Sequence, residues 1–253
     1  MLAFASTSEM DPRALHNHLV ATVRDTPLER EPFCHIYMEG ILPTALYAAM
    51  LRSLPPAAFY QPLNLRKWVR ADGTSTRDQF HLTAENLGKL PKLSASIWGQ
   101  LVRAVTDVRY KRAVFSKLAP DLADRFNVPV DQVPELPCVN EILLVRDTED
   151  YVIKPHPDGL NKLVTMQLYL PADATQIDLG TSLFKRHGRF SFGGTFEEVK
   201  RFPFKPNSGY AFAVSDGPKR TSWHGRARLS GFTGVRHTLM VLWQQVSPRT
   251  YKG

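Results

Sequence analysis

Two side chains that can bind a metal ion stand two positions apart in the segment Lys154-Pro155-His156-Pro157-Asp158. On an extended chain, residues i and i+2 point to the same side. An imidazole nitrogen of His156 and a carboxylate oxygen of Asp158 can therefore reach one ion. A His-x-Asp triplet is short and occurs in many unrelated proteins. Alone it indicates a metal site only weakly, so a second element is needed.

The second element lies closer to the C-terminus. His224 stands just before a turn, and Arg236 begins an apolar run that continues to Trp243. A guanidinium at the head of a buried strand needs an anionic partner to offset its desolvation. Strand alternation places Arg236 and Thr238 on one face and His237 on the other. A guanidinium fork beside a hydroxyl is a suitable receptor for one carboxylate.

With these residues the chain resembles the Fe(II)/2-oxoglutarate-dependent oxygenase superfamily. The family pattern is a His-x-Asp pair, a distal His some tens of residues later, and then an Arg that binds the cosubstrate. Here His224 follows Asp158 by 66 positions, and Arg236 follows His224 by 12. Other segments are also similar to bacterial members of the group and to their usual N-terminal lead-in: 32–36, 41–43, 162–165, 168–171, 179–184 and 206–208.

The resemblance implies a double-stranded β-helix, or jelly-roll, in which His156, Asp158 and His224 bind Fe(II) and leave three coordination positions open. It implies that Arg236, helped by Thr238, holds the distal carboxylate of 2-oxoglutarate. Dioxygen is the other cosubstrate. The implied activity is that of a dioxygenase, an oxidoreductase that forms succinate and CO2 while it oxidises a C–H bond, with hydroxylation as the default outcome.

The carboxylate of Asp158 discriminates among related activities. Halogenases that resemble this family have Gly or Ala at the corresponding position, so Asp158 argues against halogenation. Desaturation, ring closure and epoxidation remain open, because they differ in substrate placement rather than in the metal ligands. A jelly-roll protein that binds metal without turnover is the alternative from another class. The complete set of two His, one Asp and one Arg disfavours it.

His187 is an alternative distal ligand, in the basic turn 185–189. Its counterpart to Arg236 would be Arg201, at the +14 position. We disfavour this reading because Arg201 sits in a stretch rich in Phe and Pro rather than at the head of a regular strand. His237 alternates to the face opposite Arg236, which favours ordinary packing for its ring.

Substrate-binding residues are expected in the polar segment 61–79 and on the strands that lead into the site. The alternative for each is a solvated loop residue or simple strand packing. The candidates we select are Arg66, Arg146, Lys162, Gln167 and Tyr169.

The pattern of the chain changes near residue 135. Helical spacing of apolar residues predicts helices over 11–25, from Pro43 to Pro55-Pro56, and in 93–126, where Pro120 kinks or splits the last one. The segment 61–79, with a turn at Asp72-Gly73, is expected to be a long loop or ragged hairpin. Short β-rich runs are then predicted at 139–145, 151–153, 164–170, 182–184, 210–214 and 238–246.

This order indicates an α+β protein with a sandwich or small barrel as its core. We expect a mainly helical region, 1–135, packed on the outside of a catalytic core, 136–253. With 253 residues in all, the two regions are expected to form one compact domain.

The net charge of +8 is local. Between Lys185 and Arg236 there are eleven basic and three acidic residues, so this stretch alone accounts for +8, and the rest of the chain balances at 21 against 21. One interpretation of this basic stretch is a solvated surface. A second is that it attracts an anionic or carrier-protein-bound metabolite. Nucleic acid is not expected, because the basic residues are not interleaved with aromatics on a recognisable module.

Two cysteines make no disulfide framework, no apolar run is long enough for a membrane span, and we expect no secretory leader. We therefore expect a cytoplasmic enzyme, active on a small molecule in a biosynthetic pathway.

Overall fold

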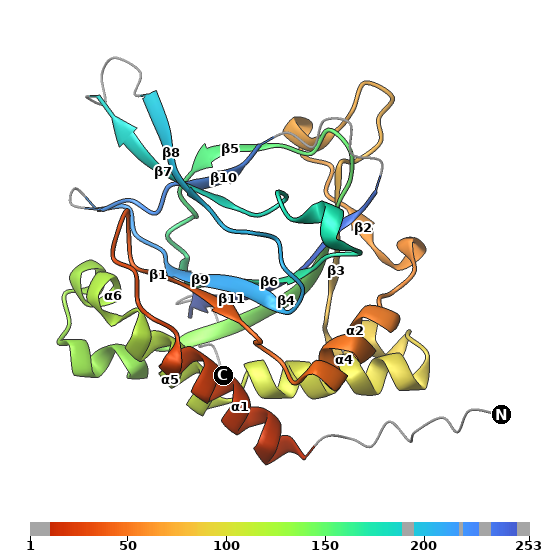
Figure 1. Ribbon diagram of the computed structural model, residues 1–253, viewed down its shortest axis with the longest axis horizontal. Coiled ribbons are helices and arrows are strands. Elements are labelled where there is room, and N and C mark those ends of the chain that lie inside the picture. The colour runs from red at the N-terminus through yellow and green to blue at the C-terminus, as the bar shows by residue number, and fades with distance from the viewer. Residues whose placement is uncertain (1–10, 189–194, 218–219, 228–233, 247–253) are drawn as a thin grey trace.

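The computed structural model describes residues 11–188, 195–217, 220–227 and 234–246. Two antiparallel sheets lie one above the other, with most helices below the larger sheet (Figure 1). The larger sheet has the order β1 (His35–Glu39), β9 (Ser208–Ala213), β6 (Lys162–Leu170), β11 (Arg236–Gln245), β4 (Cys138–Asp147), β3 (Arg77–His81) and β2 (Gln61–Pro62). The smaller has the order β5 (Ile153–His156), β10 (His224–Arg226), β7 (Ser182–His187) and β8 (Thr195–Arg201).

The helices are formed mainly by the first half of the chain, as the sequence predicts. They are α1 (Pro12–Asp25), α2 (Thr44–Arg52), α3 (Ala84–Gly88), α4 (Lys92–Val105), α5 (Val108–Lys117) and α6 (Ala119–Phe126), with short 3-10 turns at Ala57–Phe59, Arg66–Trp68, Val130–Glu135 and Ala174–Gln176. The carboxylate of Asp11 caps α1 by accepting a hydrogen bond from the Arg13 backbone N–H. Pro120 stands in the first turn of α6, where its missing N–H costs nothing, so it begins a new helix.

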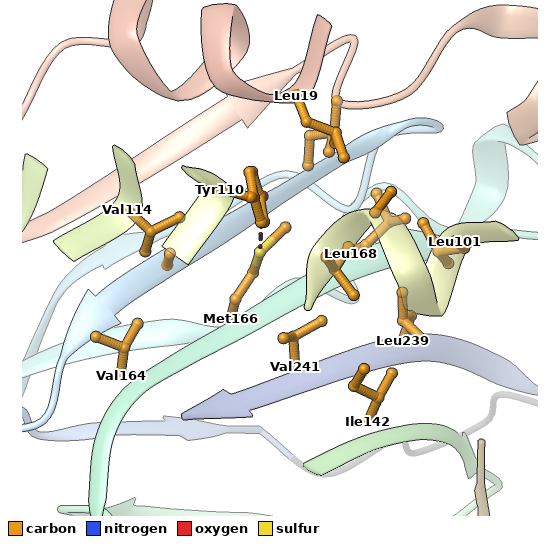
Figure 2. Packing of buried hydrophobic residues seen from close by; sticks show 14 of the residues in the cluster. Leu19, Leu101, Tyr110, Val114, Ile142, Val164, Met166, Leu168, Leu239 and Val241 are labelled. Carbon is orange, nitrogen blue, oxygen red and sulfur yellow. Dashed lines mark hydrogen bonds between the residues drawn. The ribbon is translucent and has the colours of Figure 1, made fainter. Parts of the chain in front are cut away.

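Strand alternation divides the residues of the larger sheet between two environments. On β6 and β11, Met166, Leu168 and Val241 point toward the helices and pack with Leu101 and Tyr110 in the main core (Figure 2). The hydroxyl of Tyr110 donates to the sulfur of Met166 at 3.3 Å. This layer joins the helices to the sheet, and it commits the other face of the same strands to the space between the sheets.

The first 135 residues also contribute strands. β1 pairs with β9, and β3 pairs with β4, so both lie in the same sheet as the C-terminal strands. The N-terminal region is therefore not confined to the outside of the core. The sequence patterns missed β1 and β3 because neither HIYME nor RDQFH alternates between apolar and polar residues.

The segment 61–79 is a ragged hairpin. Gln61 pairs with Gln79 at its base, and the carboxylate of Asp72 accepts from the backbone N–H of Thr74 at its turn. The fold is thus α+β, as predicted, with two facing sheets arranged as a jelly-roll. In the part of the chain that the structure describes, no helix is long and apolar enough to cross a membrane.

Candidate active site

The three predicted metal ligands meet between the sheets. His156 ends β5, Asp158 follows two residues later, and His224 begins β10, directly opposite His156. The ring centroids of the two histidines are 4.4 Å apart. One ligand atom from each of the three residues lies within 4.8 Å of the others. Residues far apart in the sequence thus supply two imidazoles and one carboxylate to a single point.

Gly225 allows β5 and β10 to come this close. A Cβ atom at this position would lie 2.7 Å from the carbonyl oxygen of Ile153 and 3.1 Å from the backbone nitrogen of Pro155. Backbone atoms cannot move aside as a flexible side chain can, so only glycine fits without separating the strands. The close spacing of the rings of His156 and His224 therefore depends on glycine at position 225.

Both imidazoles are held with the same ring nitrogen turned away from the centre. Nδ1 of His156 lies 2.9 Å from the carbonyl oxygen of Lys154, and Nδ1 of His224 lies 2.9 Å from that of Ser222. A carbonyl oxygen only accepts, so Nδ1 carries the proton in each ring. Each Nε2 is left with its lone pair free, which is the form in which histidine binds a metal.

The carboxylate of Asp158 is held at both oxygens. The ammonium of Lys162 donates to Oδ1 at 2.7 Å, and the hydroxyl of Thr165 donates to Oδ2 at 2.6 Å. Burial alone would raise the pKa of Asp158, but His224, Lys162 and Thr165 outweigh it and lower that pKa to about 2. Burial, reinforced by His224, lowers the pKa of His156 to about 4. At neutral pH the three groups are therefore one anion and two neutral imidazoles, which suits a divalent cation.

These ligands line a cavity of about 260 Å³ between the sheets. Its floor is the inner face of the larger sheet, including Gln167 of β6 and Met240 of β11, and Lys67 and Trp68 of the ragged hairpin also border it. The hydroxyl of Tyr210 and Oε1 of Gln167 are buried there without hydrogen-bond partners. Buried polar atoms without partners are costly, so this part of the cavity is suited to a polar ligand.

Arg236 lines the same cavity and is only 1% exposed. Its Nη1 donates to Oδ2 of Asp147 at 2.8 Å, and its Nε donates to the carbonyl oxygen of Leu179 at 2.7 Å. Nη2 is buried and has no partner. The sequence predicted an anionic ligand for this guanidinium but missed Asp147, which neutralises part of its charge. Thr238 is on the same strand face, is fully buried, and has a hydroxyl without a partner, but it does not line the cavity.

Arg226 is a cavity residue that the sequence reasoning missed. It is 6% exposed, and its Nη1 donates to the carbonyl oxygen of Gly180 at 3.2 Å, while its Nε is buried without a partner. Burial, together with the positive charge of Arg236, lowers the pKa of Arg226 to about 9. The available signal was its place two residues after His224, which on a strand puts both side chains on one face.

The structure separates the five predicted substrate residues. Lys162 and Gln167 line the cavity, although Lys162 is bonded to Asp158. Tyr169 is fully buried and does not line the cavity. Its hydroxyl accepts a hydrogen bond from the backbone N–H of Thr181. Arg66 is exposed and outside the cavity lining.

Arg146 is on the wrong face of its strand to reach the cavity. Its neighbour Asp147 points into the space between the sheets, whereas Arg146 pairs with Asp78 at 2.9 Å and lies over the ring of Tyr60. Adjacent residues of a strand point to opposite faces, so the two cannot both face the cavity. Arg146 therefore does not reach the cavity, and its prediction as a substrate-binding residue is wrong.

The alternative distal ligand His187 lies at the far end of β7 and faces Glu197, 2.7 Å away, with both side chains exposed. His237 lies near Tyr60, away from the cavity lining. Of the eleven basic residues between 185 and 236, Arg189, Lys219 and Arg228 lie outside the described residues.

No family model matches the chain, and no curated protein matches it. Solved structures do match it. One is a prolyl hydroxylase from Trichoplax adhaerens, in complex with a hypoxia inducible factor peptide fragment, with a TM-score of 0.54 and 10% identity over 98% of this chain and 100% of that chain. A prolyl-4-hydroxylase from Pseudomonas putida gives a TM-score of 0.54 and 14% identity over 90% of this chain and 99% of that one.

A third match is a dioxygenase for auxin oxidation from Arabidopsis thaliana, in a binary complex with 2-oxoglutarate, with a TM-score of 0.52 and 13% identity over 95% of this chain and 91% of that chain. Identities this low establish the fold alone. The chain has the jelly-roll fold of the Fe(II)/2-oxoglutarate oxygenases, and the resemblance seen in its sequence is confirmed at that level.

The residues present fit both groups that this fold implies. Two Nε2 atoms and one carboxylate oxygen form the donor set that Fe(II) takes in such sites. The unpartnered Nη2 of Arg236, in the same cavity, is a donor suited to a carboxylate of 2-oxoglutarate.

Proposed function

We propose that the protein is an Fe(II)- and 2-oxoglutarate-dependent dioxygenase that oxidises a C–H bond of a small molecule, with hydroxylation as the simplest outcome. Succinate and CO2 are the coproducts. The observation that carries the proposal is the convergence of His156, Asp158 and His224 at one end of a cavity that also contains the buried Arg236. A metal ligand set and a carboxylate receptor in one enclosed space are what this reaction requires.

The residues of the chain have distinct tasks in this reaction. When bound, Fe(II) supplies the redox chemistry that couples decarboxylation of 2-oxoglutarate to oxidation of the substrate. His156 and His224 bind the metal through Nε2, because their Nδ1 protons are held by backbone carbonyls. Lys162 holds Oδ1 of Asp158 and Thr165 holds Oδ2, which fixes the orientation of the carboxylate, and the remaining lone pair of Oδ2, the oxygen 4.0 Å from Nε2 of His224, would bind the metal. Arg236, with its spare Nη2, orients the distal carboxylate of 2-oxoglutarate.

The size of the cavity supports a small substrate. Its volume of about 260 Å³ is below the ~300–1,000 Å³ of ordinary ligand pockets, and 2-oxoglutarate takes part of it. The substrate, or the reacting end of it, must therefore be small. Cys34 and Cys138 are free thiols, which supports the reducing, cytoplasmic setting that we also propose.

The test is turnover of 2-oxoglutarate. We expect the purified protein, supplied with Fe(II), ascorbate and dioxygen, to form succinate slowly without substrate and faster when a substrate is present. His156→Ala should abolish this succinate. If the wild-type protein bound neither Fe(II) nor 2-oxoglutarate, or if His156→Ala left succinate formation unchanged, the proposal would be wrong. Product analysis by mass spectrometry separates hydroxylation, a gain of one oxygen, from desaturation or ring closure, a loss of two hydrogens.

A further inference from the structure

Three guanidinium groups line the cavity near a single carboxylate, that of Asp147, which contacts two of them. Arg77 donates from Nε to Oδ1 of Asp147 at 2.8 Å, and Arg236 donates from Nη1 to Oδ2 at 2.8 Å. Arg226 lines the same cavity, and among the described residues no carboxylate lies within ion-pair distance of it. Three positive charges against one negative charge leave an excess of two.

This excess is costly as it stands. Arg226 and Arg236 are 6% and 1% exposed, so water does little to stabilise them. Nε of Arg226 and Nη2 of Arg236 are buried without hydrogen-bond partners. Burying an unpaired charge is unfavourable by several kcal/mol, and it is tolerated where a ligand of opposite charge completes the site. The cluster is therefore built to receive anionic groups.

The proposed function accounts for one of the two charges. The distal carboxylate of 2-oxoglutarate would neutralise Arg236, while its other end approaches the metal. Lys162 does not add to the unpaired charge, since it is paired with Asp158 at 2.7 Å, and the second carboxylate of 2-oxoglutarate would be taken up by the metal. One buried guanidinium, that of Arg226, still lacks an anion after the cosubstrate has bound.

Arg226 and Arg77 lie on the side of the cavity that the ragged hairpin borders. The guanidinium of Arg77 packs 4.4 Å from the ring centroid of Tyr151 and 5.5 Å from that of Trp68, and both rings line the cavity. Arg226 pairs across the strands with Ile153, which also lines it. Apart from these two arginines and Lys67, the residues named on this wall are aromatic or aliphatic, which suits a ligand with a small apolar body and an anionic end.

We propose that the primary substrate carries a carboxylate, and that Arg226, supported by Arg77, binds it inside the cavity alongside 2-oxoglutarate. This inference rests on the proposed function, because it is the cosubstrate that accounts for Arg236. A carboxylate matches the planar fork of an arginine and is small enough for a cavity of about 260 Å³ that is shared with 2-oxoglutarate.

The experiment compares acids with their uncharged amides. The wild-type protein, loaded with Mn(II) and saturating 2-oxoglutarate under anaerobic conditions, is titrated calorimetrically with benzoate and benzamide, and with hexanoate and hexanamide. We expect each acid to bind about tenfold or more tightly than its amide, as the loss of a charge-assisted pair implies. In Arg226→Met the ratio should fall to about one, while the affinity for 2-oxoglutarate changes less than about threefold. Arg226→Lys should recover part of the ratio.

Arg66→Met is the matched control, since Arg66 is exposed on the ragged hairpin 61–79 and does not line the cavity. It should leave the acid-to-amide ratio at its wild-type value. Arg236→Met should weaken 2-oxoglutarate instead. Circular dichroism and thermal unfolding of each variant verify that it is folded.

Equal binding of acids and amides by the wild-type protein would overturn the inference, and so would an Arg226→Met variant that weakens 2-oxoglutarate as much as Arg236→Met does. Failure of the proposed function looks different, because the wild-type protein would then not bind 2-oxoglutarate at all. An acid preference that Arg226→Met removes would in that case still support an anion site at Arg226.

Discussion

Asp147 lies directly opposite Arg236 on the neighbouring strand, and the two side chains form an ion pair of 2.8 Å that is almost completely buried. On its other side Asp147 is opposite Arg77, with which it forms a second pair at 2.8 Å. The three residues make a cross-strand row over β3, β4 and β11. Asp147 thus holds in place the arginine to which we assign the distal carboxylate of 2-oxoglutarate, and it halves the charge that this arginine and Arg77 would otherwise bury.

Asp147→Asn should therefore be strongly destabilising. It removes the carboxylate that pairs with both Arg77 and Arg236, and the loss of one partner of a buried pair costs about 3–5 kcal/mol. Chemical denaturation measures the change. Glu149→Gln, at an exposed acid two residues later, should change the free energy of unfolding little. If Arg77→Met added to Asp147→Asn restored no stability, the explanation by uncompensated charge would be wrong.

Metal binding should depend on the histidines of the cavity and not on the alternative candidate. His156→Ala and His224→Ala are each expected to weaken Mn(II) or anaerobic Fe(II) binding by more than about 100-fold, because loss of a partner outside the ligand set already costs about 10–100-fold. His187→Ala should bind the metal as the wild type does, since His187 faces Glu197 on an exposed hairpin. Isothermal titration calorimetry measures all three, and a loss of affinity in His187→Ala would contradict our ligand assignment.

Lys162 is expected to act on the metal through Asp158. Lys162→Met leaves Oδ1 of Asp158 without its donor and lets the carboxylate turn, so metal affinity should fall about 10–100-fold. Lys154→Met removes the same charge from an exposed position on β5 and serves as the control. Direct substrate binding by Lys162 would instead leave metal affinity intact and change the KM of the substrate.

Gly225→Ala tests the close approach of β5 and β10. The new Cβ would lie 2.7 Å from the carbonyl oxygen of Ile153, so the strands must separate. We expect a loss of about 1–3 kcal/mol in the free energy of unfolding, together with weaker metal binding. Gly88→Ala is the matched control, because a Cβ at Gly88 in α3 meets no atom within 4 Å. Equal stability of Gly225→Ala and Gly88→Ala would show that glycine is not required at position 225.

His237 should make the stability of the protein depend on pH. Burial, followed by the charge of Arg146, lowers its pKa from 6.5 to about 4. Its unfolded form therefore binds a proton more readily than its folded form between these values. The contribution of neutral His237 to the free energy of unfolding is fully present above about pH 6.5 and is lost as the pH falls toward 4. His237→Gln should remove roughly 1–3 kcal/mol of this pH dependence. Parallel unfolding curves of wild type and variant across this range would contradict the assignment.

The sequence led to three proposed metal ligands, and the structure brings their side chains together. A two-residue spacing on an extended chain puts His156 and Asp158 on one side, whatever the rest of the protein does. The same alternation correctly directed Arg236 inward and His237 outward. For Arg146, alternation alone could not tell whether the side chain faces the cavity or the helices. That depends on which face of the larger sheet the helices cover.

The sequence by itself thus determined which side chains share a strand face, His156 with Asp158 and Arg236 with Thr238, since motif spacing and strand alternation are short-range properties of the chain. Only the tertiary structure decided what surrounds that chemistry. Asp147 is 89 residues from Arg236 in the sequence, and strand register alone makes them partners. Strand pairing also brings Arg226 and Arg77 to one cavity. The balance of charge that points to an anionic substrate is set by distances through space, which no pattern along the chain contains.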